Sequence, residues 1–72
     1  MIVEVGKQYT TRGGMVATIT HDVSQWSPLY SMKGFVSDAT GKKIMPTCMW
    51  TTSGIYYVDH PTNYDLIKPI EV

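Results

Sequence analysis

Hydrophobic and polar residues alternate in short stretches along the chain, and turn-forming residues separate one stretch from the next. Such alternation is typical of strands with one buried face, because successive side chains of a strand point to opposite faces. No long stretch carries hydrophobic positions at helical spacing behind a capping residue. The pattern therefore predicts an all-β chain of short antiparallel strands. The turn signals are Arg12-Gly13-Gly14, Ser27-Pro28, Asp38-Ala39-Thr40-Gly41, Thr52-Ser53-Gly54 and Pro61-Thr62-Asn63.

Strands are predicted between these turns, and two of them have a clear inner face. A glycine in the middle of the third strand, Gly34, indicates a sharp bend or a close approach of two backbones. The predicted ranges are 5–11, 15–21, 29–37, 43–51, 55–58 and 66–71. The predicted inner-face residues are Met15, Ala17 and Ile19 in the second strand and Tyr30, Met32, Gly34 and Val36 in the third.

The predicted fourth strand is hydrophobic on both faces. Pro46 lies within it and cannot donate a ladder hydrogen bond, so this strand should lie at a sheet edge or carry a bulge. Pro69 supports an edge position for the last strand for the same reason. The predicted inner face of the fourth strand carries Ile44, Pro46, Cys48 and Trp50, and its opposite face carries Met45, Thr47 and Met49.

Five to six short strands in so short a chain fit a small, strongly bent antiparallel barrel of the SH3-like type. We expect residues 1–72 to form this single domain. A three-stranded sheet with a covering loop is the alternative architecture. In either case the core is small, because a chain of this size buries only about 60% of the surface that its unfolded form exposes.

Composition narrows the classes of function. Six Lys and Arg balance six Asp and Glu, so the formal net charge is zero, and hydrophobic residues make up 43% of the chain. No hydrophobic run is long enough for a membrane-spanning helix, and the first residues do not resemble a signal peptide. The single cysteine, Cys48, cannot form an intramolecular disulfide.

Residue types used in metal and acid–base sites are few and match no known motif. In His21-Asp22 the two side chains point to opposite sides of an extended backbone, which suits a shared metal poorly. Cys48 falls on a predicted inner face and no helix lies near it, so we interpret it as a small buried residue. We therefore expect no enzyme, no metal site and no cofactor. The candidates considered are His21, Asp22, Asp59, His60 and Asp65.

A protein partner is the better prediction, because two strands carry hydrophobic residues on both faces and a small barrel buries only one. Tyr, Trp and Met are enriched in protein interfaces. Trp26 and Tyr30 flank a proline in a predicted loop, where Trp26 either contacts a partner or folds back as a lid over the core. The predicted partner-binding residues are Trp26, Leu29, Tyr30, Met45, Met49 and Tyr57.

Two other classes of function stay open. Small barrels also present aromatic side chains to nucleic acids, and Lys33, Lys42 and Lys43 would then contact phosphates. The zero net charge argues against this class. Alternatively, the surplus hydrophobic surface joins copies of the chain into a homo-oligomer.

Residues 6–14, residues 50–56 and Asp65-Leu66 together resemble stretches of small uncharacterised proteins encoded by tailed bacteriophages and prophages. Residues 6–14, GKQYTTRGG, are similar to their opening pattern G-K-x-Y-x-T-R-x-G. Residues 50–56, WTTSGIY, are similar to their recurring W-T-x-x-G-x-Y, and Asp65-Leu66 resembles their closing D-L. The chain departs from the pattern at Met15 and at Cys48-Met49, where it is more hydrophobic.

The resemblance implies a cellular context and brings no site residues with it. It implies a phage accessory protein in the cytoplasm of a bacterial host, where one unpaired cysteine stays reduced. Proteins of that class commonly bind and block a host protein, including components of host defence. The resemblance therefore implies a non-enzymatic protein that inhibits or redirects a host protein.

Overall fold

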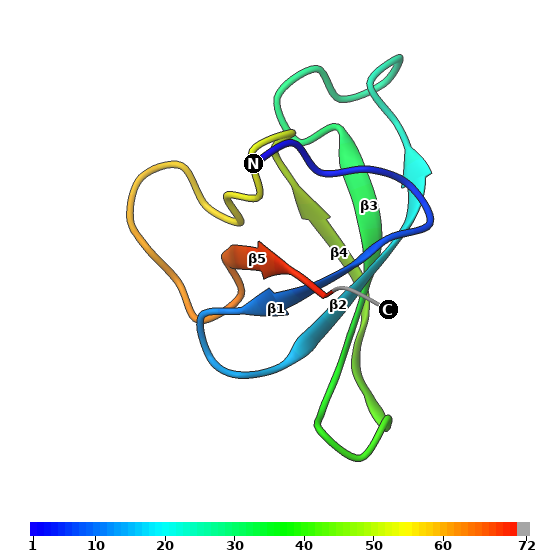
Figure 1. Ribbon diagram of the computed structural model, residues 1–72. Helices are drawn as coiled ribbons and strands as arrows, with labels where there is room; N and C mark the ends of the chain where they lie inside the picture. The colour runs from blue at the N-terminus through cyan, green and yellow to red at the C-terminus, as the bar shows by residue number, and fades with distance from the viewer. Residues whose placement is uncertain (71–72) are drawn as a thin grey trace.

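The computed structural model of the protein describes residues 1–70, which contain one antiparallel sheet. The order of strands across the sheet is β4-β3-β2-β1-β5, so β4 and β5 are its edges (Figure 1). The all-β prediction is confirmed, since these residues contain no helix and thus none that could cross a membrane. The strands are β1 (Gln8–Thr11), β2 (Val16–Asp22), β3 (Met32–Ser37), β4 (Lys43–Trp50) and β5 (Leu66–Pro69).

The two prolines predicted to mark edge strands do so. Pro46 lies within β4 and Pro69 ends β5, and each of these strands has only one neighbour in the sheet. A proline in a central strand would remove a ladder hydrogen bond, so its edge position is the expected one. The last strand was predicted to extend to residue 71, which lies outside the described residues.

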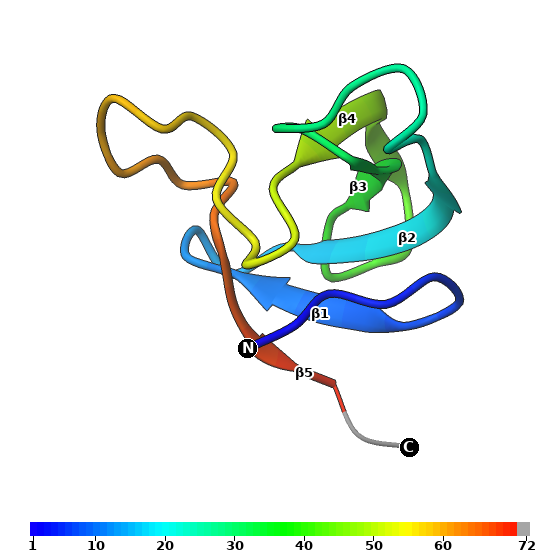
Figure 2. The ribbon, with the colours of Figure 1, turned by 90° about the horizontal axis from the view of Figure 1, so that it is seen from above.

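Gly34 lets β2 and β3 approach closely where the sheet bends. A Cβ atom on Gly34 would lie 1.9 Å from the backbone oxygen of Thr18, so no side chain fits there. The β2–β3 register also shifts between Ile19 and His21, next to this contact. Such a bulge increases the local twist of a sheet. As a result β3 and β4 lie above β2 in Figure 2, and β1 and β5 lie below it.

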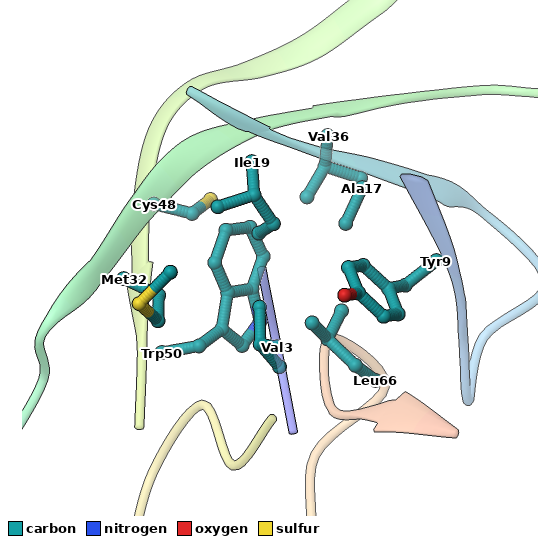
Figure 3. Packing of buried hydrophobic residues seen from close by; sticks show 9 residues of the cluster. All are labelled: Val3, Tyr9, Ala17, Ile19, Met32, Val36, Cys48, Trp50 and Leu66. Atoms are coloured by element: carbon teal, nitrogen blue, oxygen red, sulfur yellow. The ribbon is translucent and has the colours of Figure 1, made fainter. Parts of the chain in front are cut away.

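The concave side of the sheet encloses a small hydrophobic core, with Trp50 at its centre (Figure 3). Each strand contributes to it, and so does the segment before β1. The predicted inner faces are confirmed for Ala17 and Ile19 in β2 and for Met32 and Val36 in β3. The buried hydrophobic residues are Val3, Tyr9, Ala17, Ile19, Met32, Val36, Cys48, Trp50 and Leu66.

β4 does not keep one inner face along its length. Its pairing with β3 shifts register twice, and the first shift places one extra residue between Met45 and Cys48. Met45 therefore lies opposite Val36 and packs against the core, whereas Ile44 and Pro46 are exposed. The prediction that Ile44 and Pro46 face inward and Met45 faces outward is wrong, because a bulge reverses the alternation beyond it.

Residues 55–58, predicted to form a strand, lie instead in the loop between β4 and β5. The loop begins with a turn in which Gly54 N donates to the backbone oxygen of Thr51 at 3.0 Å. Gly54 has a φ of 93°, a conformation that glycine adopts without steric cost. Tyr56 N then donates to the side chain of Asp65 and not to a neighbouring strand. The segment therefore does not join the sheet.

Candidate partner-binding groove

The loop between β4 and β5 is held in place by the carboxylate of Asp65. Its Oδ1 accepts hydrogen bonds from Tyr56 N and Thr62 Oγ1, both at 3.0 Å, and its Oδ2 accepts one from Thr62 N at 3.2 Å. Arg12 Nη2, from the turn between β1 and β2, lies 3.5 Å from Asp65 Oδ2. One side chain therefore joins both halves of the loop to the β1–β2 hairpin.

These contacts stabilise the ionised form of Asp65. The side chain is nearly buried, and burial by itself would raise its pKa. The N–H groups of Tyr56 and Thr62, the Thr62 hydroxyl and the charge of Arg12 outweigh burial, so the pKa of Asp65 falls below the usual 3.8. At neutral pH the carboxylate is ionised and can accept all of these hydrogen bonds.

Two further hydrogen bonds fix the same loop from other directions. Trp50 Nε1 donates to the backbone oxygen of Tyr64 at 2.8 Å, which connects the loop to the core. Val58 N donates to Tyr30 Oη at 3.2 Å, which connects the loop to the segment between β2 and β3. Because these partners belong to different elements, the position of the loop depends on the whole fold.

A groove of about 740 Å³ lies between this loop, β4 and the segment between β2 and β3. The groove is shallow and widely open to solvent. Four of the five tyrosines of the chain line it: Tyr30, Tyr56, Tyr57 and Tyr64. We therefore name it the tyrosine groove. Its other lining residues are Ser27, Thr47, Cys48, Met49, His60, Thr62 and Asn63.

The aromatic rings of the tyrosine groove pack against one another. The ring centroids of Tyr56 and Tyr64 are 5.1 Å apart, and Tyr56 meets the buried Trp50 edge-on at 6.3 Å. Tyr57 and His60 pack edge-to-face at 4.7 Å. Burial, together with the proximity of Cys48 and Tyr64, raises the pKa of Tyr56. Its hydroxyl therefore stays neutral at physiological pH.

The structure brings three of the six predicted partner-binding residues together in the tyrosine groove. Trp26 and Leu29 do not line it; they precede the lining residues Ser27 and Tyr30 in the segment between β2 and β3 and have exposed fractions of 79% and 54%. This exposure shows that Trp26 is not a lid over the core. Met45 does not line the groove, and it packs, partly buried, against the core. The three residues in the groove are Tyr30, Met49 and Tyr57.

Sequence analysis missed three aromatic residues of the tyrosine groove: Tyr56, Tyr64 and His60. His60 was considered only as part of a metal site. The available signal was the concentration of aromatic residues around Pro61, in a stretch without regular alternation. Aromatic side chains on a loop need either a core or a partner to contact, and here Tyr56 packs against the core residue Trp50.

None of the three lysines predicted for nucleic-acid binding belongs to the groove lining, but Lys33 is the cross-strand neighbour of a lining residue. Lys33 pairs with Met49 across β3 and β4. Lys43 Nζ lies 4.2 Å from the ring centroid of Phe35 on the outer face of the sheet. Lys42 lies in the β3–β4 turn, where its backbone N–H donates to Asp38 Oδ1 at 3.0 Å. Of the three, Lys43 is therefore placed on the outer face of the sheet by its contact with Phe35.

The other reactive side chains of residues 1–70 do not cluster into a second candidate site. No three His, Cys, Asp or Glu side chains in this part of the chain lie close enough to hold a metal ion. Cys48 is buried, and burial raises the pKa of its thiol. A second hollow, of about 970 Å³, lies between the N-terminal segment, β1 and the end of β5, and contains none of the predicted site residues.

Comparison with protein-family models, with curated proteins and with solved structures found no match to this chain. The function must therefore be argued from the groove itself. Its distinguishing features are the density of tyrosine rings, the exposed Trp26 next to it and a loop fixed by Asp65.

Proposed function

We propose that the protein is a non-enzymatic module that binds another protein through the tyrosine groove. The observation that carries this proposal is the concentration of four of the five tyrosines in one groove. Tyrosine offers a large contact area, a small loss of side-chain entropy on binding and a hydroxyl for hydrogen bonding. Trp26 and Leu29, exposed beside the groove, extend the same surface.

For the fold we propose a partly open SH3-like barrel. The return of β5 to pair with β1 after a four-stranded meander supports it. Further support comes from two backbone hydrogen bonds near the end of β4: Leu66 N donates to the oxygen of Gly54 at 2.9 Å, and Val3 N donates to that of Thr52 at 2.8 Å. The first bond connects β5 to the turn after β4 and so brings the two edges of the sheet toward each other, although β4 and β5 are not paired; the second connects the segment before β1 to the same turn.

The proposed cellular context is that of a phage accessory protein in the cytoplasm of a bacterial host. There it binds a host protein and inhibits or redirects it, as in host takeover or anti-defence. The sequence resemblance described above supports this context. Cys48-Met49, where the chain is more hydrophobic than the proteins it resembles, lies in the lining of the groove. Such a difference would suit a surface specific for one partner.

The test uses the tagged full-length protein to capture a partner from bacterial lysate, followed by titration calorimetry with the purified partner. Trp26→Ala and Tyr57→Ala should each weaken binding by about tenfold or more, as substitutions at interface hot spots do. Ile67→Ala is the matched control, because Ile67 is exposed on β5 and does not line the groove. Equal affinity of all three variants would overturn the groove as the binding site.

Nucleic-acid binding is the second candidate, favoured by the distribution of charge on the outer face of the sheet. Cross-strand pairing places one residue from each of the five strands side by side in a row. The row has a lysine at each end and no Asp or Glu between them. Fluorescence anisotropy with a labelled oligonucleotide at low and moderate salt tests it, since phosphate contacts weaken steeply with salt. Salt-independent or absent binding would exclude this candidate. The residues of the row are Lys68, Thr10, Val16, Ser37 and Lys43.

Self-association is the third candidate, and light scattering across a concentration series decides it. A monomer at every concentration would leave the exposed surface around Trp26 available for a different protein. A stable dimer would show that hydrophobic surface is already used between copies of the chain. Trp26→Ala would then convert the dimer to a monomer if the same surface is involved.

A further inference from the structure

The segment before β1 is anchored in the core by one buried residue. Val3 is only 4% exposed, and among residues 1–70 it is the one member of the hydrophobic core that lies outside the five strands. The other six residues of the segment are exposed. We name residues 1–7 the N-terminal strap, because a single buried side chain holds this otherwise exposed stretch against the core (Figure 3).

Two hydrogen bonds fix the anchor of the strap. Val3 N donates to the backbone oxygen of Thr52 at 2.8 Å, and Glu4 N donates to the hydroxyl oxygen of the buried Tyr9 at 2.8 Å. Beside the anchor, other strap residues line the hollow of about 970 Å³ together with β1 and the end of β5. A segment with few buried contacts and exposed surroundings opens locally at a lower cost than the sheet itself.

Gly6 separates the anchored part of the strap from the sheet. It has a φ of 85°, and no atom lies within 4 Å of the position that a Cβ would take there. Gly6 N donates to the backbone oxygen of Ile19 at 2.9 Å, and Ile19 N donates to that of Lys7 at 3.1 Å. Residues 1–5 can therefore leave the core by rotation at this glycine while the chain beyond it stays bonded to β2.

The turn that receives the strap leads directly into a wall of the tyrosine groove. Thr52, which accepts the hydrogen bond of the strap, lies in a turn that Thr51 N closes by donating to the backbone oxygen of Ile55 at 2.9 Å. The next residue, Tyr56, lines the groove and packs edge-on against Trp50. The anchor of the strap belongs to the same core cluster as this tryptophan. Backbone and side chain of the anchor thus both lead to the same wall.

We propose that Val3 is a positioning residue for the tyrosine groove, and that the strap, residues 51–55 and the groove wall at Tyr56 open and close as one unit. The docked strap holds the turn, and the turn holds the wall. This inference rests on the proposed function, because it gives the proposed binding surface a support that lies outside its lining. A ligand that binds only the ordered groove would favour the docked strap, since binding to one of two states shifts the equilibrium toward it.

Val3→Ala tests this unit, with Val36→Ala as the matched control. Both substitutions remove the same groups from the same core, since Val36 is fully buried in β3. Amide hydrogen exchange of the free full-length protein is followed by NMR. Val3→Ala should accelerate exchange at residues 54–56 about tenfold, because it makes opening of the strap easier. Val36→Ala should leave exchange at these residues unchanged, because Val36 stays packed when only the strap opens.

The β2–β3 ladder serves as an internal reference in the same spectra. Its amides exchange through global unfolding, so both variants should accelerate them to a similar extent. Val3→Ile, which keeps an aliphatic anchor, should restore exchange at residues 54–56 to within about threefold of the wild type. Equal acceleration at residues 54–56 in Val3→Ala and Val36→Ala would overturn the inference, because these amides would then report only on global stability. No acceleration in Val3→Ala would overturn it as well.

The coupling must also act in the opposite direction, because a coupling free energy between two sites is reciprocal. Asp65→Asn weakens the hold on Tyr56, so it should accelerate exchange of the Val3 amide. Asp59→Asn, in the exposed part of the same loop, should leave the Val3 amide unchanged. An unchanged Val3 amide in Asp65→Asn would contradict a single unit.

These measurements use the free protein, so their outcome is independent of the proposed function. If a captured protein partner binds Trp26→Ala and Tyr57→Ala with unchanged affinity, the proposed function fails while the coupling between strap and groove wall stands. If those variants lose the partner but residues 54–56 exchange alike in Val3→Ala and Val36→Ala, the positioning role of Val3 fails and the proposed function stands.

Discussion

Trp50 Nε1 donates a 2.8 Å hydrogen bond to the backbone oxygen of Tyr64, so the centre of the core is bonded to a wall of the tyrosine groove. Trp50 is fully buried in β4, whereas Tyr64 lies in the loop that precedes β5. Tyr56, packed edge-on against Trp50, makes a second contact of the same kind. A substitution of Trp50 therefore directly affects two residues that line the groove, Tyr56 and Tyr64.

Trp50→Phe tests this connection. The substitution removes the hydrogen bond to Tyr64 and leaves a cavity, and both effects destabilise, so the free energy of unfolding should fall by about 2 kcal/mol. Urea denaturation measures this. Trp26→Phe is the matched control, because Trp26 is 79% exposed, and its effect should stay within about 0.5 kcal/mol. Equal stability of the two variants would contradict the central position of Trp50.

Asp65→Asn should destabilise the protein by about 2 kcal/mol at neutral pH, because the amide cannot reproduce the charged hydrogen bonds of the carboxylate. The pKa of Asp65 is lowered in the folded state, so its contribution is present above its unfolded pKa of about 3.8. That contribution is lost as the pH falls through the lower folded value. Denaturation curves at several acidic pH values should therefore converge for the wild type and the variant.

The control for this prediction is Asp59→Asn, in the exposed part of the same loop. It should change the free energy of unfolding at neutral pH by no more than about 0.5 kcal/mol. A constant difference between wild type and Asp65→Asn down to strongly acidic pH would show that the charge of Asp65 does not stabilise the loop.

Local pattern was sufficient to predict the positions of the five strands and much of the core, although it also predicted a strand at 55–58 that the structure does not form. Strict alternation around Ala17 and Ile19 reports directly on which face is buried, and Gly34 and the two prolines mark the bend and the edges. The alternation failed in β4, where a bulge between Met45 and Cys48 exchanges the two faces. A bulge depends on the partner strand, so the sequence of β4 alone does not reveal it.

The tyrosine groove was predicted only in part, for a related reason. Tyr30, Met49 and Tyr57 were identified from residue type and from the excess of hydrophobic positions. Their assembly depends on Asp65, whose contacts reach across the loop and back to Arg12. Long-range polar contacts of this kind leave no periodic signal, because they join residues far apart in the chain.

Gly34→Ala should be strongly destabilising. The added methyl would lie 1.9 Å from the backbone oxygen of Thr18, so β2 and β3 would have to separate, at a cost of about 3 kcal/mol or more. Gly41→Ala is the matched control, because Gly41 has a φ of 89° in an open turn with no atom near the position of its Cβ. It should cost only about 1 kcal/mol, the strain of the left-handed conformation. Thermal denaturation ranks the two variants, and an equal loss would contradict the close approach at Gly34.

Cys48 should react slowly with thiol reagents in the folded protein. Its side chain is buried, and burial raises the pKa of the thiol above the usual 9.0, so little thiolate is present at pH 8. We expect the folded protein to react roughly a hundredfold more slowly than the urea-unfolded chain, because reaction requires local or global opening.

Since the neutral thiol is the form stabilised by folding, labelling should accelerate and stability should fall as the pH rises above 9.0. Cys48 also belongs to the lining of the tyrosine groove. Rapid, stoichiometric labelling of the folded protein at pH 8 would show that the floor of the groove is open to solvent.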